Sequence, residues 1–336
     1  MRKILGVCLL LITVFVLPVA SAEPPKYDSL YVFGDSLSDT GNDLILTRIQ
    51  RIKPPIPPSE SPHRTYYNGR FSNGPVAVEY LWRLLRGNNS VSLNPFLANI
   101  NLPAQGGINF AFGGSKSDYL NQMPGGIYVP GALGQIELFR KALKGKRAKA
   151  TALYTVWTGA NDYLLLLEEG ASPPPPGEVV ANITQAIKTL HSLGARHFVV
   201  PNLPDLGLTP FMQEKGLGAE FLLLTQSHNA LLVQALNGLA PRLPGIKIFF
   251  VDLFQVSQDL LNESENPIVT TPPAVETLPG GTGAASCFFI NPATCPDVDV
   301  TADLAQPFAF WDLMHPTTFI HNHYGRAMFK SLQPKP

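Results

Sequence analysis

Ser36, Asp312 and His315 are the residues of this sequence whose types suit nucleophilic catalysis. A serine hydroxyl is a poor nucleophile until a base takes its proton, and an imidazole base needs a partner that fixes its tautomer. Asp312 and His315 are three positions apart, so they can lie on one face of a helical turn and supply both base and partner. Taken alone, the pair is equally a surface aspartate with a capping histidine, and Ser36 is equally a helix cap.

Two internal segments add the donors that a reaction with a developing oxyanion requires. Residues 107–114 contain three glycines, and residues 158–162 read Thr-Gly-Ala-Asn-Asp. Backbone N–H groups of glycines and the Asn161 amide are donors of the type found in oxyanion holes. Alternatively, each segment has residues that commonly form a turn and need have no catalytic role. The functional interpretation is favoured because all four segments occur in order and three of them follow expected strands.

Alternating strands and helices are expected to position these segments. We expect strands at residues 30–33, 108–112, 153–157, 197–200 and 246–251, and helices at 76–85, 133–143, 179–190 and 220–239. This alternation predicts βαβ units and one α/β domain with a central parallel sheet covered by helices on both faces. Ligands of such sheets bind beyond the carboxyl ends of the strands. Residues 54–76 and 263–300 are rich in Pro and Gly and are expected to be long loops.

The chain resembles a known family in several separated blocks. Residues 34–37 spell Gly-Asp-Ser-Leu, the signature of the GDSL esterases and lipases, also called SGNH hydrolases. The resemblance extends to residues 67–75 and 202–207 and covers nearly the whole chain after the N-terminal segment. It implies a flavodoxin-like three-layer α/β/α sandwich. It also implies that Ser36 is the nucleophile, His315 the base and Asp312 its partner.

The same resemblance assigns the oxyanion hole to three donors. These are the backbone N–H of Ser36, the backbone N–H of a glycine in the second block, and the side chain of Asn161. Counting along the block points to Gly114, with Gly113 as the alternative because the glycine is doubled, and Gly107 as a third choice.

The first 22 residues have the layout of a secretory signal peptide. Arg2 and Lys3 precede an apolar run over residues 4–17, and Ala20-Ser21-Ala22 offers small residues for a peptidase. The run is shorter than the roughly 20 apolar residues of a membrane anchor. We therefore expect cleavage after Ala22, a secreted or periplasmic protein, and a single domain over residues 23–336.

Cysteine usage agrees with export. Cys8 would leave with the signal peptide, so only Cys287 and Cys295 would remain. Two thiols in an exported chain with no third competitor predict one local disulfide within the 263–300 insertion. A metal pair is the alternative, but the residues between the two cysteines include no His or acidic ligand. Because the ring precedes Asp312 closely, we expect it to lie over the active site.

Two other kinds of site are less well supported by the sequence. The α/β-hydrolase fold uses Gly-x-Ser-x-Gly, and the nearest match, residues 113–117, lacks the last glycine. His315, His321 and His323 cluster near the C-terminus, but no cysteine or carboxylate stands near them at zinc-ligand spacing. We expect no metal and no cofactor.

The amino-acid composition indicates which classes of partner and substrate to expect. Lys and Arg number 25, Asp and Glu also number 25, and only 15% of residues are charged, so nucleic-acid binding is not expected. We expect the substrates to be fatty-acyl esters of lipids, above all lysophospholipids, because of the low charge, the expected export and the resemblance to secreted lipolytic enzymes. We also expect contact with a membrane surface and acyl transfer to a sterol. The alternatives are an esterase of acetylated polysaccharides or short-chain esters, and a non-catalytic lipid-binding protein, which should have lost one of the three catalytic residues.

Overall fold

The computed structural model describes residues 27–103, 105–123, 126–168, 172–263 and 267–334. The predicted signal peptide, residues 1–22, and its cleavage site lie outside the described residues.

Six parallel strands form the central sheet, in the order β2-β3-β1-β6-β7-β8. Their bounds are β1 Ser29–Gly34, β2 Asn94–Pro95, β3 Gly106–Asn109, β6 Leu153–Trp157, β7 His197–Pro201 and β8 Lys247–Val251. Strand β1 lies at the centre, with Tyr31 opposite Ile108 of β3 on one side and Tyr154 of β6 on the other. Parallel strands of this kind are covered on both faces, and every residue of β1 and β6 is buried.

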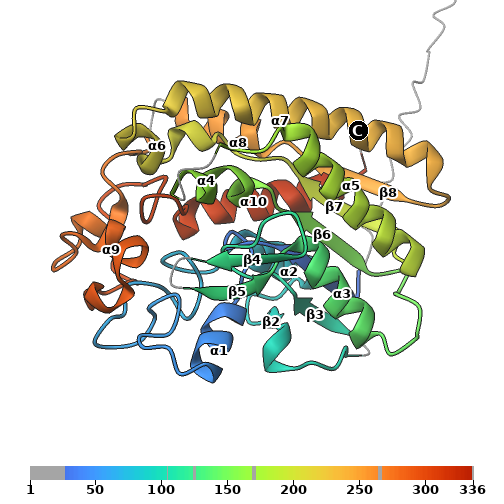
Figure 1. Ribbon diagram of the computed structural model, residues 1–336, viewed down its shortest axis with the longest axis horizontal. Helices are drawn as coiled ribbons and strands as arrows, with labels where there is room; N and C mark the ends of the chain where they lie inside the picture. The colour runs from blue at the N-terminus through green and yellow to red at the C-terminus, as the bar shows by residue number, and fades with distance from the viewer. Residues whose placement is uncertain (1–26, 104, 124–125, 169–171, 264–266, 335–336) are drawn as a thin grey trace, which may run out of the picture.

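Helices cover both faces of the sheet (Figure 1). Strand β1 divides its side chains by alternation: Tyr31 and Phe33 belong to one core, and Leu30 and Val32 belong to the other. The first core is closed by α3 (Ala132–Ala142), α5 (Pro176–Leu193) and α7 (Gly218–Leu239), and the second by α2 (Ala77–Arg86), α8 (Leu253–Leu261) and α10 (Thr318–Ser331). The predicted three-layer α/β/α architecture is therefore confirmed.

The boundaries of one expected strand were wrong. Strand β3 ends at Asn109, whereas the sequence pattern placed the strand over residues 108–112. The Asn109 side chain turns back on its own backbone, accepting from the Ala111 N–H and donating to the Ser38 carbonyl. The chain leaves the regular ladder there and enters the glycine turn that follows.

Several elements were not predicted. They are α1 (Asn42–Ile49), α4 (Ala160–Glu168), α6 (Pro210–Glu214), α8, α10, and the antiparallel hairpin β4 (Leu120–Met123) and β5 (Ile127–Pro130). Short 3-10 helices occur at Phe96–Ala98, Leu206–Leu208, Ala240–Arg242, Ala274–Thr277 and Pro292–Thr294. No helix within the described ranges is long and apolar enough to cross a membrane.

The two long loops meet at one edge of the molecule. Residues 54–76 carry no helix or strand, as expected, whereas the 263–300 insertion contains a short helix, α9 (Ala284–Ile290). Figure 1 shows α9 at the edge of the molecule, above the loop that follows α1. A disulfide joins Cys287 in α9 to Cys295, the pair that the sequence predicts.

Candidate active site

Ser36 lies in a tight turn directly after β1. The turn is closed by the Ser38 and Asp39 N–H groups, which both donate to the Asp35 carbonyl. Gly34 is required at its start, because a Cβ there would lie 2.4 Å from the Trp157 carbonyl oxygen. Helix α1 begins only at Asn42, and Asp39 accepts from the N–H groups of its first turn. Ser36 therefore does not cap the helix.

Asp312 and His315 lie in a turn just before α10. The Asp312 Oδ1 atom accepts from the backbone N–H groups of Met314 and His315, at 2.8 and 2.6 Å. The expected helical turn was wrong, because this side-chain capture of two N–H groups folds the segment into an Asx turn instead. The turn leaves the second carboxylate oxygen free to face the imidazole.

The three side chains form a continuous hydrogen-bonded chain. His315 Nδ1 is 2.7 Å from Asp312 Oδ2, and His315 Nε2 is 2.9 Å from Ser36 Oγ. A carboxylate can only accept, so Nδ1 carries the proton and Nε2 is left to accept the hydroxyl proton. All three residues are buried. The arrangement can therefore activate the Ser36 oxygen for attack on a carbonyl carbon.

The structure distinguishes among the candidate glycines. Gly114 has a φ of +69°, and a Cβ there would lie 2.6 Å from Met123 Cγ. The neighbouring Gly113 N–H is directed toward the buried carboxyl group of Asp43. Gly107 lies inside β3, opposite Leu30, far from the carboxyl end of β1. These positions favour the Gly114 N–H as the donor available to a ligand.

Asn161 is held close to the glycine turn. Its Nδ2 donates to the Ser115 carbonyl at 3.0 Å. An amide carries two N–H donors, so the second remains for a ligand. Asn161 lines the same pocket as Ser36 and His315.

Asp162 is a functional candidate to which sequence reasoning gave no role. Its carboxylate accepts from the Ser117 backbone N–H at 2.9 Å and from the Ser117 hydroxyl at 2.6 Å. These bonds tie α4, which carries Asn161, to the segment that carries Gly114. Burial raises the pKa of Asp162 to about 6, and the bonds from Ser117 oppose the rise. In the sequence, Asp162 could have been identified by its position in the 158–162 segment, next to Asn161.

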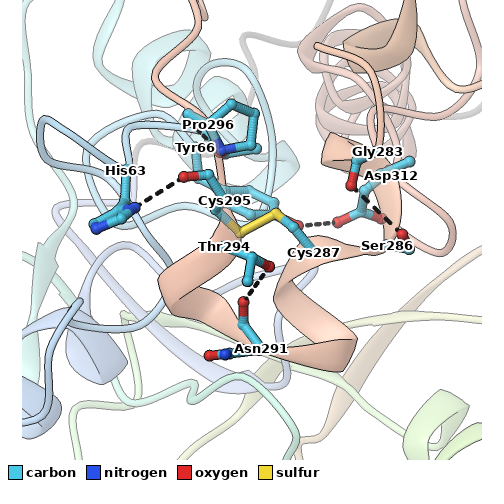
Figure 2. Close-up of a disulfide and its surroundings, with 12 residues drawn as sticks. His63, Tyr66, Gly283, Ser286, Cys287, Asn291, Thr294, Cys295, Pro296 and Asp312 are labelled. Carbon is cyan, nitrogen blue, oxygen red and sulfur yellow. Dashed lines mark hydrogen bonds between the residues drawn. A yellow bond between two sulfur atoms is a disulfide. The ribbon is translucent and has the colours of Figure 1, made fainter. Parts of the chain in front are cut away.

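Aromatic side chains form the opposite wall of the site. The Tyr66 hydroxyl donates to Asp312 Oδ2 at 2.6 Å (Figure 2). The ring centroids of Phe71 and Phe289 lie 5.2 and 6.2 Å from that of His315. Because Phe289 belongs to α9, the disulfide-bonded segment does lie beside His315. Sequence reasoning missed Tyr66 and these aromatic contacts.

An apolar pocket extends from Ser36 and His315 into the protein. It passes between the 204–209 segment, α8 and α10. Its apolar lining includes Leu37, Leu164, Leu206, Leu208, Leu261, Phe310, Met314 and Ile320. Such a pocket suits a hydrocarbon chain bonded to the reacting carbonyl.

Other titratable groups border the histidine. Burial raises the pKa of Asp35 to about 7, while the Leu37 N–H and His315 act in the opposite direction. Burial lowers the pKa of His321 to about 3, so this imidazole is neutral. The ring of His323 packs against the ring of Phe319. Within the described part of the chain, no group of three His, Cys, Asp or Glu side chains could hold a metal ion.

Comparison with known proteins places this site in context. A family model described as GDSL-like Lipase/Acylhydrolase matches residues 30–328. The chain is 27% identical to a phosphatidylcholine-sterol acyltransferase of Aeromonas hydrophila, over 94% of this chain and 92% of that protein. It is 30% identical to acetylajmalan esterase 2 of Rauvolfia serpentina, over 88% of each. Among solved structures, the acetylxylan esterase Axe2 of Geobacillus stearothermophilus aligns with a TM-score of 0.46 at 13% identity, covering 94% of this chain and 98% of that one.

Proposed function

The chain belongs to the GDSL-like lipase/acylhydrolase family, whose members hydrolyse ester bonds, and from this premise we propose that Ser36 is its nucleophile. The observation that carries the proposal is the hydrogen-bonded chain from Ser36 through His315 to Asp312 at the mouth of an apolar pocket. A non-catalytic binding protein on this fold would have no need for that chain.

The reaction follows from the geometry of the three residues. His315 Nε2 takes the Ser36 proton as Oγ bonds to the ester carbonyl carbon, which becomes tetrahedral. The imidazolium, stabilised by Asp312, then gives this proton to the oxygen of the leaving alcohol as the carbon–oxygen bond breaks. Water attacks the resulting acyl-enzyme, with His315 accepting its proton and returning it to Ser36 Oγ.

The oxyanion of each tetrahedral intermediate needs fixed donors. We assign them to the backbone N–H groups of Ser36 and Gly114 and to the Asn161 amide. The assignment is supported by the bond from Asn161 Nδ2 to the carbonyl of Ser115, the residue that follows Gly114, and by the positive φ of Gly114. The Asp162–Ser117 pair holds the same two segments together.

The substrates that we propose are fatty-acyl esters of lipids, most simply lysophospholipids. The apolar pocket supports this class, because each buried methylene contributes roughly 0.8 kcal/mol to binding. The similarity to a phosphatidylcholine-sterol acyltransferase supports acyl transfer to an alcohol in place of water. We also propose that the chain is exported after cleavage at Ala22 and acts at a lipid surface.

A carbohydrate acetyl esterase or general short-chain carboxylesterase is the second candidate. The observation that favours it is the similarity to acetylajmalan esterase 2. An acetyl group would leave most of the apolar pocket unfilled, so such an enzyme should gain little from longer chains.

One experiment separates these candidates. Purified protein is given lysophospholipid, phospholipid, triglyceride and acetylxylan side by side, with and without a sterol, and the released acid and the sterol ester are measured. We expect fatty-acid release from lysophospholipid to dominate and Ser36→Ala to abolish it. A preference for acetylxylan would overturn the lipid assignment, and full activity in Ser36→Ala would overturn the mechanism.

A further inference from the structure

Tyr66 makes the long-range hydrogen bond to the catalytic carboxylate. Its hydroxyl lies 2.6 Å from Asp312 Oδ2, across a sequence separation of 246 residues. Both side chains are fully buried, at 0% exposure. The other donors to this carboxylate, the Met314 and His315 N–H groups and His315 Nδ1, come from the same turn.

We propose that Tyr66 is a positioning residue that sets the orientation and the charge of Asp312 toward His315. The proposal rests on the proposed function, in which Asp312 stabilises the imidazolium. With four donors, both carboxylate oxygens are fully used and the plane of the group is fixed. Without the Tyr66 hydroxyl, Oδ2 would keep only the bond to His315 Nδ1, so the plane of the carboxylate would be held less firmly.

Tyr66 is held in place by its own set of contacts. The preceding residue, Thr65, is held by its backbone and by its side chain. Its carbonyl accepts from Trp311 Nε1 at 3.0 Å, and its hydroxyl donates to the Pro296 carbonyl at 2.7 Å. The Tyr66 ring packs edge-on against Phe71 and Phe288, at 6.1 and 6.0 Å between centroids. Figure 2 shows the ring behind the disulfide, with its hydroxyl directed at Asp312. A ring fixed in this way can hold a carboxylate in one orientation.

The proton of the pair stays on the tyrosine oxygen. Burial raises the pKa of Tyr66 well above its ordinary value, and the adjacent Asp312 raises it further. The hydroxyl therefore donates throughout the working range of pH. A donor on Oδ2 draws negative charge away from the face that meets His315, so it weakens the attraction for the imidazolium.

Removing the hydroxyl has a directional consequence. In Tyr66→Phe the carboxylate keeps more charge for the imidazolium, so His315 stays protonated to a higher pH and the acid limb of the kcat/KM profile moves up. We expect a movement of about 0.5–1 pH unit and a loss of about tenfold in kcat at neutral pH, with KM little changed. Asp35 and His321 also face His315, but neither is altered by the substitution.

The experiment measures pH profiles on p-nitrophenyl butyrate for wild type, Tyr66→Phe and Tyr154→Phe. Tyr154 is a matched control, because it is also buried and its hydroxyl donates to the Lys149 carbonyl at 2.8 Å, away from the site. We expect the acid limb to move only in Tyr66→Phe, although both variants lose a buried hydrogen bond and some thermal stability.

A second readout does not depend on turnover. The protonation of His315, followed by NMR of histidine-labelled protein, should move to higher pH in Tyr66→Phe and stay unchanged in Tyr154→Phe. An unchanged His315 titration and acid limb in Tyr66→Phe would overturn the role of Tyr66, even while Ser36→Ala remained inactive. Full activity of Ser36→Ala would instead overturn the proposed function, and the NMR titration would still decide the hydrogen-bond effect.

Discussion

The floor and the roof of the active site are built by different means. The floor consists of the turns after β1, β3 and β6, residues 34–42, 109–117 and 158–162, and it is held by hydrogen bonds between buried polar groups. The roof consists of residues 63–71 and 284–296, and it is held by aromatic packing around one disulfide. The floor carries the proposed nucleophile and oxyanion donors, whereas the roof packs against His315 and binds Asp312 through Tyr66.

This difference predicts different responses to mutation. Loss of a floor residue should remove a reacting group or a donor while the fold survives, because such groups act mainly in the transition state. Loss of a roof contact should change stability and the environment of His315 more gradually. The following predictions, from the largest expected effect to the smallest, test this division.

The largest effect is expected for the nucleophile. Ser36→Ala removes the oxygen that forms the acyl-enzyme, so essentially all ester hydrolysis should disappear while the thermal unfolding midpoint stays near that of wild type. Turnover of p-nitrophenyl butyrate and a thermal unfolding curve measure both. Ser38→Ala is a suitable control in the same turn, since Ser38 Oγ has no hydrogen-bond partner. Comparable losses in the two variants would contradict a chemical role for Ser36.

The next effect is expected for an oxyanion donor. Asn161→Ala should lower kcat by roughly 10²–10³ with KM little changed, because the amide is needed mainly when negative charge develops. Steady-state kinetics on the same ester provides the measurement. Asn182→Ala is the control, since its amide donates to the Ser117 hydroxyl, outside the proposed oxyanion hole. A rise in KM at constant kcat would show that Asn161 acts in substrate binding instead.

The chemistry of the floor was largely visible in the sequence. Ser36 and Asn161 are polar residues in short segments just after strands, where parallel sheets place their sites. Asp312 and His315, which face this floor from the turn before α10, were candidates because of their residue types and spacing. The sequence could not predict the Asx turn at Asp312, because a separation of three residues fits a helix equally well. The side-chain bonds to the backbone decide between the two.

The roof could not be predicted from local patterns. Tyr66 lies in a loop with no helical or strand periodicity, and its partner is 246 residues away. The spacing of Cys287 and Cys295 predicted a ring but not the helix within it, because the Pro and Gly around the ring indicated only a loop. Contacts of this kind depend on the tertiary fold, so no short-range pattern in the sequence records them.

The disulfide should affect stability more than chemistry. Replacing both Cys287 and Cys295 by Ser should lower the free energy of unfolding by about 2–3 kcal/mol, as expected for a short closed loop. Activity on a short ester should fall only modestly, whereas the chain-length preference should change because Phe288 and Phe289 lose their tether. Denaturant unfolding and a series of p-nitrophenyl esters test this. Unchanged rates and preference would show that the ring is a staple and not part of the roof of the site.

The smallest effect is expected beneath the floor, at the buried carboxyl group of Asp43. Burial and the adjacent Asp39 raise the pKa of Asp43 well above its ordinary value, and the Gly113 N–H directed at the carboxyl group opposes the rise. The native state therefore keeps this proton at pH values where the unfolded chain has lost it, so stability falls as pH rises from about 4 toward the native pKa. Asp43→Asn removes this loss. The variant should match wild type near pH 4 and exceed it by about 1 kcal/mol or more at pH 8, measured by denaturant unfolding at both values. Asp39→Asn is a contrasting variant: burial raises the pKa of Asp39 too, to about 6, but its carboxylate accepts from the Gly41, Asn42 and Asp43 N–H groups, so its loss should destabilise the protein. Equal stability of Asp43→Asn and wild type at pH 8 would show that burying this carboxyl group beneath the floor does not lower the free energy of unfolding.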